Sequence, residues 1–213
     1  MNNNFVNMKK IIPIVIISAV FIFIGSIAKA ETTKTYINKN GSYSLRYPAT
    51  WYFWGGNSFT PSGSSFSPKE SMKKNTPYFN VGIGKENEIN SLSLKYLKRG
   101  WATYIKNYVA ILKKNHNIGD TTDGETASVS SSTYSLRGYT ASAIIFKSTF
   151  YGKGKVVHVG SSKIILVTKD MKTVYAIEGA YTNTADSVHT VGQLPKNPYT
   201  TDFQNMVQSF RIK

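Results

Sequence analysis

Residues 139–167 read YTASAIIFKSTF, then YGKG, then KVVHVGSSKIILV, and this stretch decides the fold. Strand-like apolar runs lie on both sides of the turn at 151–154. They predict two strands, over 139–150 and 155–167, in which successive side chains point to opposite faces. Gly152 and Gly154 supply the backbone freedom that a tight hairpin turn requires. The sequence therefore predicts a long antiparallel hairpin.

Other segments extend this hairpin into a sheet. Residues 36–54 alternate in strand fashion around a turn at 38–41, and residues 78–83 and 173–181 form two more expected strands. An extended piece is expected at 210–212. Residues 55–77 are rich in Gly, Ser, Pro and Asn, and this composition predicts a long exposed loop.

Two helices are expected beside these strands. Residues 93–114 carry apolar side chains at three- and four-residue spacing, which predicts one amphipathic helix. Gly100 lies inside this helix and costs about 1 kcal/mol relative to alanine. A second, short helix is expected over 201–208. The order of strand pair, helix, meander and helix predicts an α+β fold with an antiparallel sheet.

Near the two ends of the chain stand YSLRYPATW (residues 43–51) and QSFR (residues 208–211). The first resembles the opening strand of the PsbP-like (Mog1/PsbP) superfamily, and the second is similar to the end of its closing helix. The resemblance covers most of residues 34–213 and implies an αβα sandwich with a central antiparallel sheet. Members include extrinsic proteins of photosystem II, a nuclear-transport accessory protein and exported bacterial proteins. The family has no shared catalytic motif, so the resemblance implies a non-catalytic role.

The first thirty residues have the features of a removable export signal. Lys9 and Lys10 precede an apolar run over 11–24, and Ala28 and Ala30 are the small residues that signal peptidase requires. The sequence predicts a cleaved signal peptide over residues 1–30, cut near Ala30. A single PsbP-like domain is expected over 31–213, secreted or otherwise extracytoplasmic.

Charge and cysteine content restrict the classes of partner and chemistry. The net charge of +15 becomes +12 without the signal, because three lysines and no acidic residue precede the cut. This favours an anionic cell-envelope component, lipid headgroups contacted only peripherally, or an acidic protein partner, with nucleic acid a weaker candidate. Simple solubilisation is the competing interpretation. The chain has no cysteine, which excludes disulfides, thiol catalysis and a cysteine-linked lipid anchor of the kind frequent in the family's exported bacterial members.

Basic side chains without acidic neighbours characterise the predicted helix 93–114. Its candidate binding residues are Lys95, Lys98, Arg99 and Lys106. Such a surface can steer and bind an anionic partner, although lysines on the solvent side of a helix are also the ordinary arrangement. A second basic group comprises Lys147, Lys153, Lys155 and Lys163. It supports a functional basic surface only if the two groups share one face.

An aromatic run at residues 51–54 gives a second binding hypothesis. Consecutive residues of a strand face opposite sides, so about two of the four rings should be buried. Trp51 is assigned to the core, and Trp54, beside Gly55 and Gly56, is the candidate exposed ring that binds a sugar or a partner. The alternative function is therefore a small-ligand or glycan-binding protein with a cleft beside residues 55–77.

The sequence contains no catalytic or metal-binding motif. His116, His158 and His189 are widely separated and lack ligand spacing, and Asp120, Asp123 and Glu125 do not match a calcium loop. There is no G-x-S-x-G motif. No catalytic residue, metal or cofactor is therefore predicted, and a secreted hydrolase ranks last among the alternatives.

Overall fold

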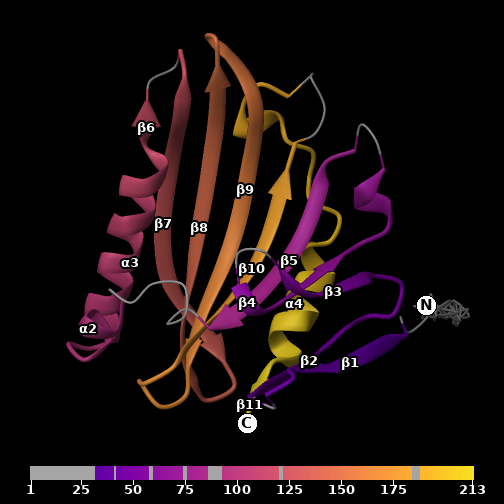
Figure 1. Ribbon diagram of the computed structural model, residues 1–213, viewed down its shortest axis with the longest axis vertical. Helices are drawn as coiled ribbons and strands as arrows, with labels where there is room; N and C mark the ends of the chain where they lie inside the picture. The colour runs from indigo at the N-terminus through magenta and orange to yellow at the C-terminus, as the bar shows by residue number, and fades with distance from the viewer. Residues whose placement is uncertain are drawn as a thin grey trace, which may run out of the picture. The chain divides into compact units, whose positions relative to one another are not determined.

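Figure 1 shows the computed structural model, which describes residues 32–40, 42–57, 60–73, 76–85, 93–119, 122–183 and 188–213. The predicted export signal lies outside these residues. It belongs to a separate unit, Met1–Ala30, and the remaining chain, Glu31–Lys213, forms one compact unit. No helix among the described residues is both long and apolar enough to cross a membrane.

The predicted hairpin forms the centre of an eight-stranded antiparallel sheet. Strands β8 (Tyr139–Gly152) and β9 (Lys155–Thr168) pair along their whole length, and β10 (Val174–Thr182) continues the meander. The sheet order is β3-β4-β5-β10-β9-β8-β7-β6. Its other strands are β3 (Tyr52–Asn57), β4 (Thr60–Ser67), β5 (Tyr78–Lys85), β6 (Ile118–Gly119) and β7 (Gly124–Leu136).

Helices cover both faces of this sheet (Figure 1). Helices α2 (Ser93–Leu97) and α3 (Trp101–His116) pack on the face that carries Ile144, Ile164 and Leu166. Helix α4 (Thr200–Ser209) packs on the opposite face, against a core that includes Ile165 and Val167. The two cores use alternate residues of the same strands, as the period of a strand requires. The αβα sandwich with a central antiparallel sheet is confirmed.

A smaller three-stranded sheet joins the beginning of the described chain to its end. It contains β1 (Thr33–Ile37), β2 (Tyr43–Pro48) and β11 (Arg211–Ile212), in the order β1-β2-β11. The Arg46 backbone N–H donates to the Ser209 hydroxyl at 2.8 Å, although the two residues are 163 positions apart. The last residue continues the pattern, since the Lys213 N–H donates to the Ser42 carbonyl at 3.1 Å.

The single helix expected over 93–114 is wrong, because the helix breaks at Gly100. This glycine has a φ of 103°, a conformation that residues with a Cβ rarely adopt. Helix α2 therefore ends in a turn, and α3 begins anew at Trp101. The apolar spacing continues across the break because both helices pack on the same sheet face.

The long exposed loop expected over 55–77 is also wrong in the described part of that range. Strand β4 and a short 3-10 helix, Glu70–Met72, occupy much of it. Ser64, Ser65 and Ser67 are buried, and each has a hydrogen-bond partner. The Ser64 hydroxyl lies 3.1 Å from the Tyr43 hydroxyl, and the other two donate to the Asn80 side-chain oxygen at 3.0 Å. Paired in this way, small polar residues form an interior strand.

Candidate functional site

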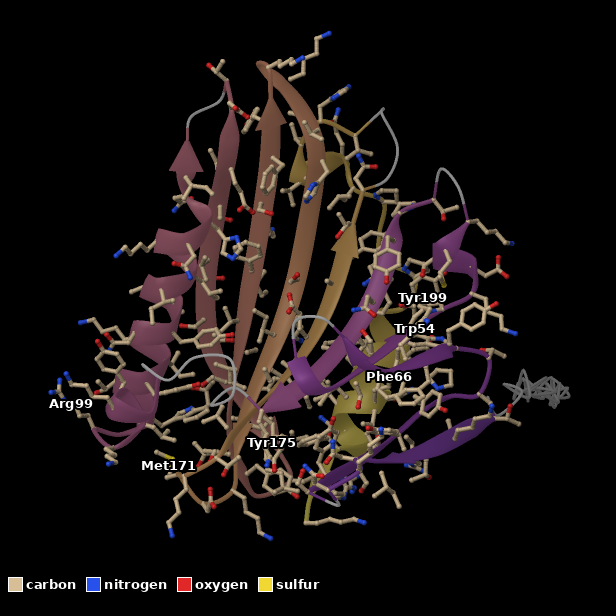
Figure 2. All side chains as sticks on the ribbon, in the orientation of Figure 1. Trp54, Phe66, Arg99, Met171, Tyr175 and Tyr199 are labelled. Carbon is tan, nitrogen blue, oxygen red and sulfur yellow. The ribbon has the colours of Figure 1, made fainter. Side chains whose placement is uncertain are left out.

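The end of the molecule at α2 gathers basic residues from two distant segments. A cavity of about 410 Å³ is lined by Lys95, Leu97 and Lys98 together with Met171 and Lys172 from the turn between β9 and β10. Lys95, Lys98, Arg99 and Lys172 are exposed and define what we call the basic end. Figure 2 shows Arg99 and Met171 at this end.

Local structure fixes the position of the basic end. Leu97 is buried in the core beneath α2, and the Gly100 N–H donates to the Leu97 carbonyl at 3.0 Å, which closes the turn after the helix. In the facing turn, the Asp170 carboxylate accepts the backbone N–H groups of Lys172 and Thr173 at 2.9 and 3.1 Å. These hydrogen bonds lower the pKa of Asp170, so its carboxylate stays ionised and orders the turn.

The structure separates Lys106 from the other three helix residues proposed as binding residues. Lys106 is exposed on α3, but it lines a different cavity of about 490 Å³ between that helix and β7. Lys95 and Lys98 lie together, and Arg99 follows them in the turn that closes α2. The sequence did not indicate Lys172, because its turn is more than seventy residues away from α2 along the chain.

Two members of the second basic group, Lys147 and Lys163, do not share a surface with the helix lysines. Lys147 lies opposite Ser161, and Lys163 opposite Gly179, on the sheet face that α4 covers. Both line a cavity of about 310 Å³ that also includes Phe203 of α4. The Lys163 ammonium group lies 5.4 Å from the centre of the Tyr134 ring. The second basic group was expected to support a functional basic surface only if it shared one face with the helix lysines. Lys147 and Lys163 do not share that face, so they give no such support.

The aromatic run at 51–54 is divided between core and surface. Trp51 is 7% exposed and packs edge-on against Phe79 and Tyr199. Trp54 is 38% exposed on the edge strand β3, with its ring centre 5.8 Å from that of Tyr52. Trp54 lines none of the cavities described above. Figure 2 places it on the other side of the view from Arg99 and Met171.

The titratable groups of the sheet face that α3 covers do not form a metal site. The His116 Nδ1 lies 2.9 Å from the Glu125 carboxylate, and His158 stacks on Phe150. Burial raises the pKa of Glu178, while a hydrogen bond from Ser162 and the charge of His116 oppose the rise. Among the described residues, no three or more histidine and acidic side chains are placed to hold a metal ion.

Among known proteins, the chain resembles solved structures in its fold and matches no sequence family. No protein-family model and no curated protein sequence matches it. The solved structure of cyanobacterial PsbP (CyanoP) from Synechocystis sp. PCC 6803 aligns over 89% of this chain and 96% of its own, with 14% identity and a TM-score of 0.50. The Ran-binding protein Mog1p of Saccharomyces cerevisiae aligns over 86% and 96%, with 12% identity and a TM-score of 0.51. The protein has the PsbP/Mog1-like fold, and the resemblance drawn from the sequence is confirmed at that level.

Proposed function

We propose that this protein is a non-catalytic extracytoplasmic binding or accessory protein whose basic end engages an anionic component of the cell envelope. The observation that supports the proposal is that Lys95, Lys98 and Lys172 line one cavity although they come from two segments. Lysines drawn together from separate elements concentrate positive potential at one end of the surface. An acidic protein partner would be drawn to the same surface.

The composition of the cavity supports a partner with both charge and apolar surface. Leu97 and Met171 line it beside the lysines, so a bound group can bury apolar atoms while its anionic part meets the ammonium groups. An export signal, if cleaved as expected, leaves a protein of net charge +12 in the compartment where such partners occur.

Co-sedimentation tests the proposal directly. The purified protein is mixed with envelope fragments and, separately, with anionic lipid vesicles, at low and at high salt. Binding should fall steeply as the salt concentration rises, because exposed charges are screened over about 10 Å at 0.1 M salt. Binding to fragments alone points to a polymer or protein of the envelope, and binding to both points to its lipid. No binding at any salt concentration refutes the proposal.

A matched pair of variants separates the basic end from overall charge. Lys95→Gln/Lys98→Gln removes two charges at the basic end, and Lys113→Gln/Lys114→Gln removes two exposed charges near the far end of α3. The first variant should lose most binding and the second should keep it. Equal loss in both would mean that only net charge matters, and the basic end would then have no special role.

A second candidate function rests on the exposed rings of β3. Tyr52 is 45% exposed beside Trp54, and the Lys69 ammonium group lies 5.3 Å from the centre of the Tyr52 ring. Flat rings at a sheet edge offer a surface on which sugars stack, which supports glycan binding. Trp54→Ala should then abolish binding to soluble envelope glycans, with little dependence on salt. Binding that survives this substitution rejects the glycan candidate.

A further inference from the structure

Another cavity, which shares no lining residue with the basic end, is bordered by two arginines. It measures about 440 Å³ and lies where α4, β2 and the turn between β7 and β8 meet. Its lining includes Arg46, Tyr47, Arg137, Asp202, Asn205 and Gln208. The volume falls in the range of small-molecule sites.

On the floor of this cavity, one hydroxyl forms hydrogen bonds to two elements of the fold. The Ser209 hydroxyl accepts the Arg46 backbone N–H at 2.8 Å and lies 2.7 Å from the Met206 carbonyl, to which it donates. Ser209 and Met206 both line the cavity and are buried. The backbones of α4 and β2 are therefore joined beneath the site.

Arg137 occupies a turn position that its side chain does not favour. The turn between β7 and β8 has two central residues, Arg137 with φ of 39° and Gly138 with φ of 77°. Such turns favour Asn, Asp or Gly at the first position. A residue with a longer side chain in the left-handed region is strained, and strain of this kind is concentrated at functional sites. Lys153 occupies the equivalent position in the turn between β8 and β9, so the argument for Arg137 depends on its place in the cavity wall and not on its backbone conformation alone.

The two guanidinium groups are available to a ligand. Among the described residues, neither Arg46 nor Arg137 forms an ion pair through its side chain. Arg211, by contrast, donates to the carbonyls of Gln208 and Phe210. A guanidinium group matches the two oxygens of a carboxylate, and such charge-assisted hydrogen bonds are about twice as strong as neutral ones.

We propose that this cavity binds a small organic carboxylate that also carries an amide, such as an acylated amino acid or the end of a short peptide. Arg46 and Arg137 bind the carboxylate. Asn205 and Gln208 offer both donors and acceptors to the amide. Asp202 in the cavity wall offsets one of the two arginine charges, so affinity depends also on the contacts to the amide, which inorganic phosphate lacks.

Calorimetric titration with two isosteric probes tests this assignment. N-acetylalanine carries the carboxylate, and N-acetylalaninamide replaces it with a neutral amide of nearly the same shape. The first should bind at least about tenfold more tightly than the second, because a hydrogen bond to a charged group contributes about that factor. Inorganic phosphate is the third probe and should bind more weakly than N-acetylalanine. Equal binding of the two isosteres, no heat with N-acetylalanine at millimolar concentrations, or tighter phosphate binding overturns the proposal.

The chain provides a control for each charge removed. Arg137→Gln and Lys153→Gln each remove one positive charge from the first position of a two-residue turn whose second residue is glycine. Lys153 has a φ of 54° and Gly154 a φ of 72°. Only Arg137 lines the cavity. Arg137→Gln and Arg46→Gln should each weaken N-acetylalanine binding about tenfold, and Lys153→Gln should leave it unchanged. Equal weakening by Lys153→Gln would show a general charge effect and refute the site.

A further variant separates binding from folding. Arg137→Asn places a residue that tolerates the left-handed region at the strained position. Its melting temperature should stay the same or rise while N-acetylalanine binding falls. Retained binding would contradict the role of Arg137. Both outcomes are independent of the basic end, so failure here leaves the proposed function standing, and the converse also holds.

Discussion

Replacing Ser209 by alanine tests how the two ends of the described chain are held together. The Ser209 residue is 8% exposed. The substitution removes its hydroxyl group, which forms the hydrogen bonds to Arg46 and Met206. The Arg46 backbone N–H then loses its acceptor, because β11 pairs with β2 only at residues 43 and 44. Alanine also fits the last turn of α4 without a clash, so the expected loss is specific to the hydrogen bonds.

The magnitude follows from two opposing contributions. The substitution removes two hydrogen bonds, one part-buried to the Arg46 N–H and one buried to the Met206 carbonyl, and each costs about 0.5–1.5 kcal/mol. The higher helix propensity of alanine returns about 0.5 kcal/mol. The net loss of about 1–2 kcal/mol corresponds to a melting temperature lower by about 2–8 °C for a domain of this size.

Thermal unfolding followed by circular dichroism measures this shift. Ser135→Ala is the control, because Ser135 is exposed on β7 and its loss should change stability by less than about 0.5 kcal/mol. If Ser209→Ala unfolds at the wild-type temperature, or no lower than Ser135→Ala, then the hydroxyl does not stabilise the junction and our reasoning fails.

Three further substitutions test other parts of the structure. Gly100→Ala should lower the free energy of unfolding by about 1–3 kcal/mol in urea titrations, because φ there is 103°, although no atom obstructs the added methyl group. An unchanged urea midpoint would contradict this. Burial raises the pKa of Glu178, so the native state favours the protonated acid and loses stability as pH rises through that pKa. Glu178→Gln should therefore melt higher than wild type at neutral pH, with the difference shrinking toward pH 4; a constant difference would argue against titration of this group. Burial also raises the pKa of Tyr43 to about 12 from 10.0, so the wild type should lose stability as pH rises between these values. Tyr43→Phe should show a smaller loss in the same melts, because burial also raises the pKa values of Tyr181 and Tyr199. An identical slope in the variant would reject the assignment.

Strongly alternating segments were predictable, because their side-chain pattern alone determines which face is buried. Phe79, Val81 and Ile83 alternate along β5 and are all buried, as expected. The hairpin at 151–154 was correct for the same reason and because glycine marked its turn. The turn at Arg137 and Gly138 was not predicted, although the sequence signals it with a glycine between two strand patterns.

The strand formed by residues 60–67 was not predictable from composition. Serine-rich segments usually remain in loops because serine buries little apolar surface. Here the serines face Tyr43 and Asn80, which satisfy their hydroxyl groups inside the protein. Those partners lie outside the segment, so no local pattern could reveal them.

The candidate sites were predictable only in part. Exposure of Lys95 and Lys98 followed from helix periodicity, whereas their meeting with Lys172 depends on how α2 packs against a remote turn. The separation of Lys147 from the helix lysines depends on strand register, since a shift of one residue reverses the face. Sequence patterns assign a residue to a surface more readily than they assign two residues to the same surface.

The pairing of β11 with β2 has a consequence for the order in which the protein is assembled. Residues 209–213 provide the Ser209 hydroxyl, β11 and the Lys213 N–H that complete the small sheet, and Ser209 follows Arg46 by 163 positions along the chain. A nascent chain therefore cannot close this sheet until residues 209–213 have been synthesised. Contacts between distant parts of a sequence form slowly, since a long loop must close first. Early in synthesis, β2 therefore lacks its β11 partner and the Arg46 backbone N–H lacks the Ser209 hydroxyl, until the C-terminal part of the domain has been made.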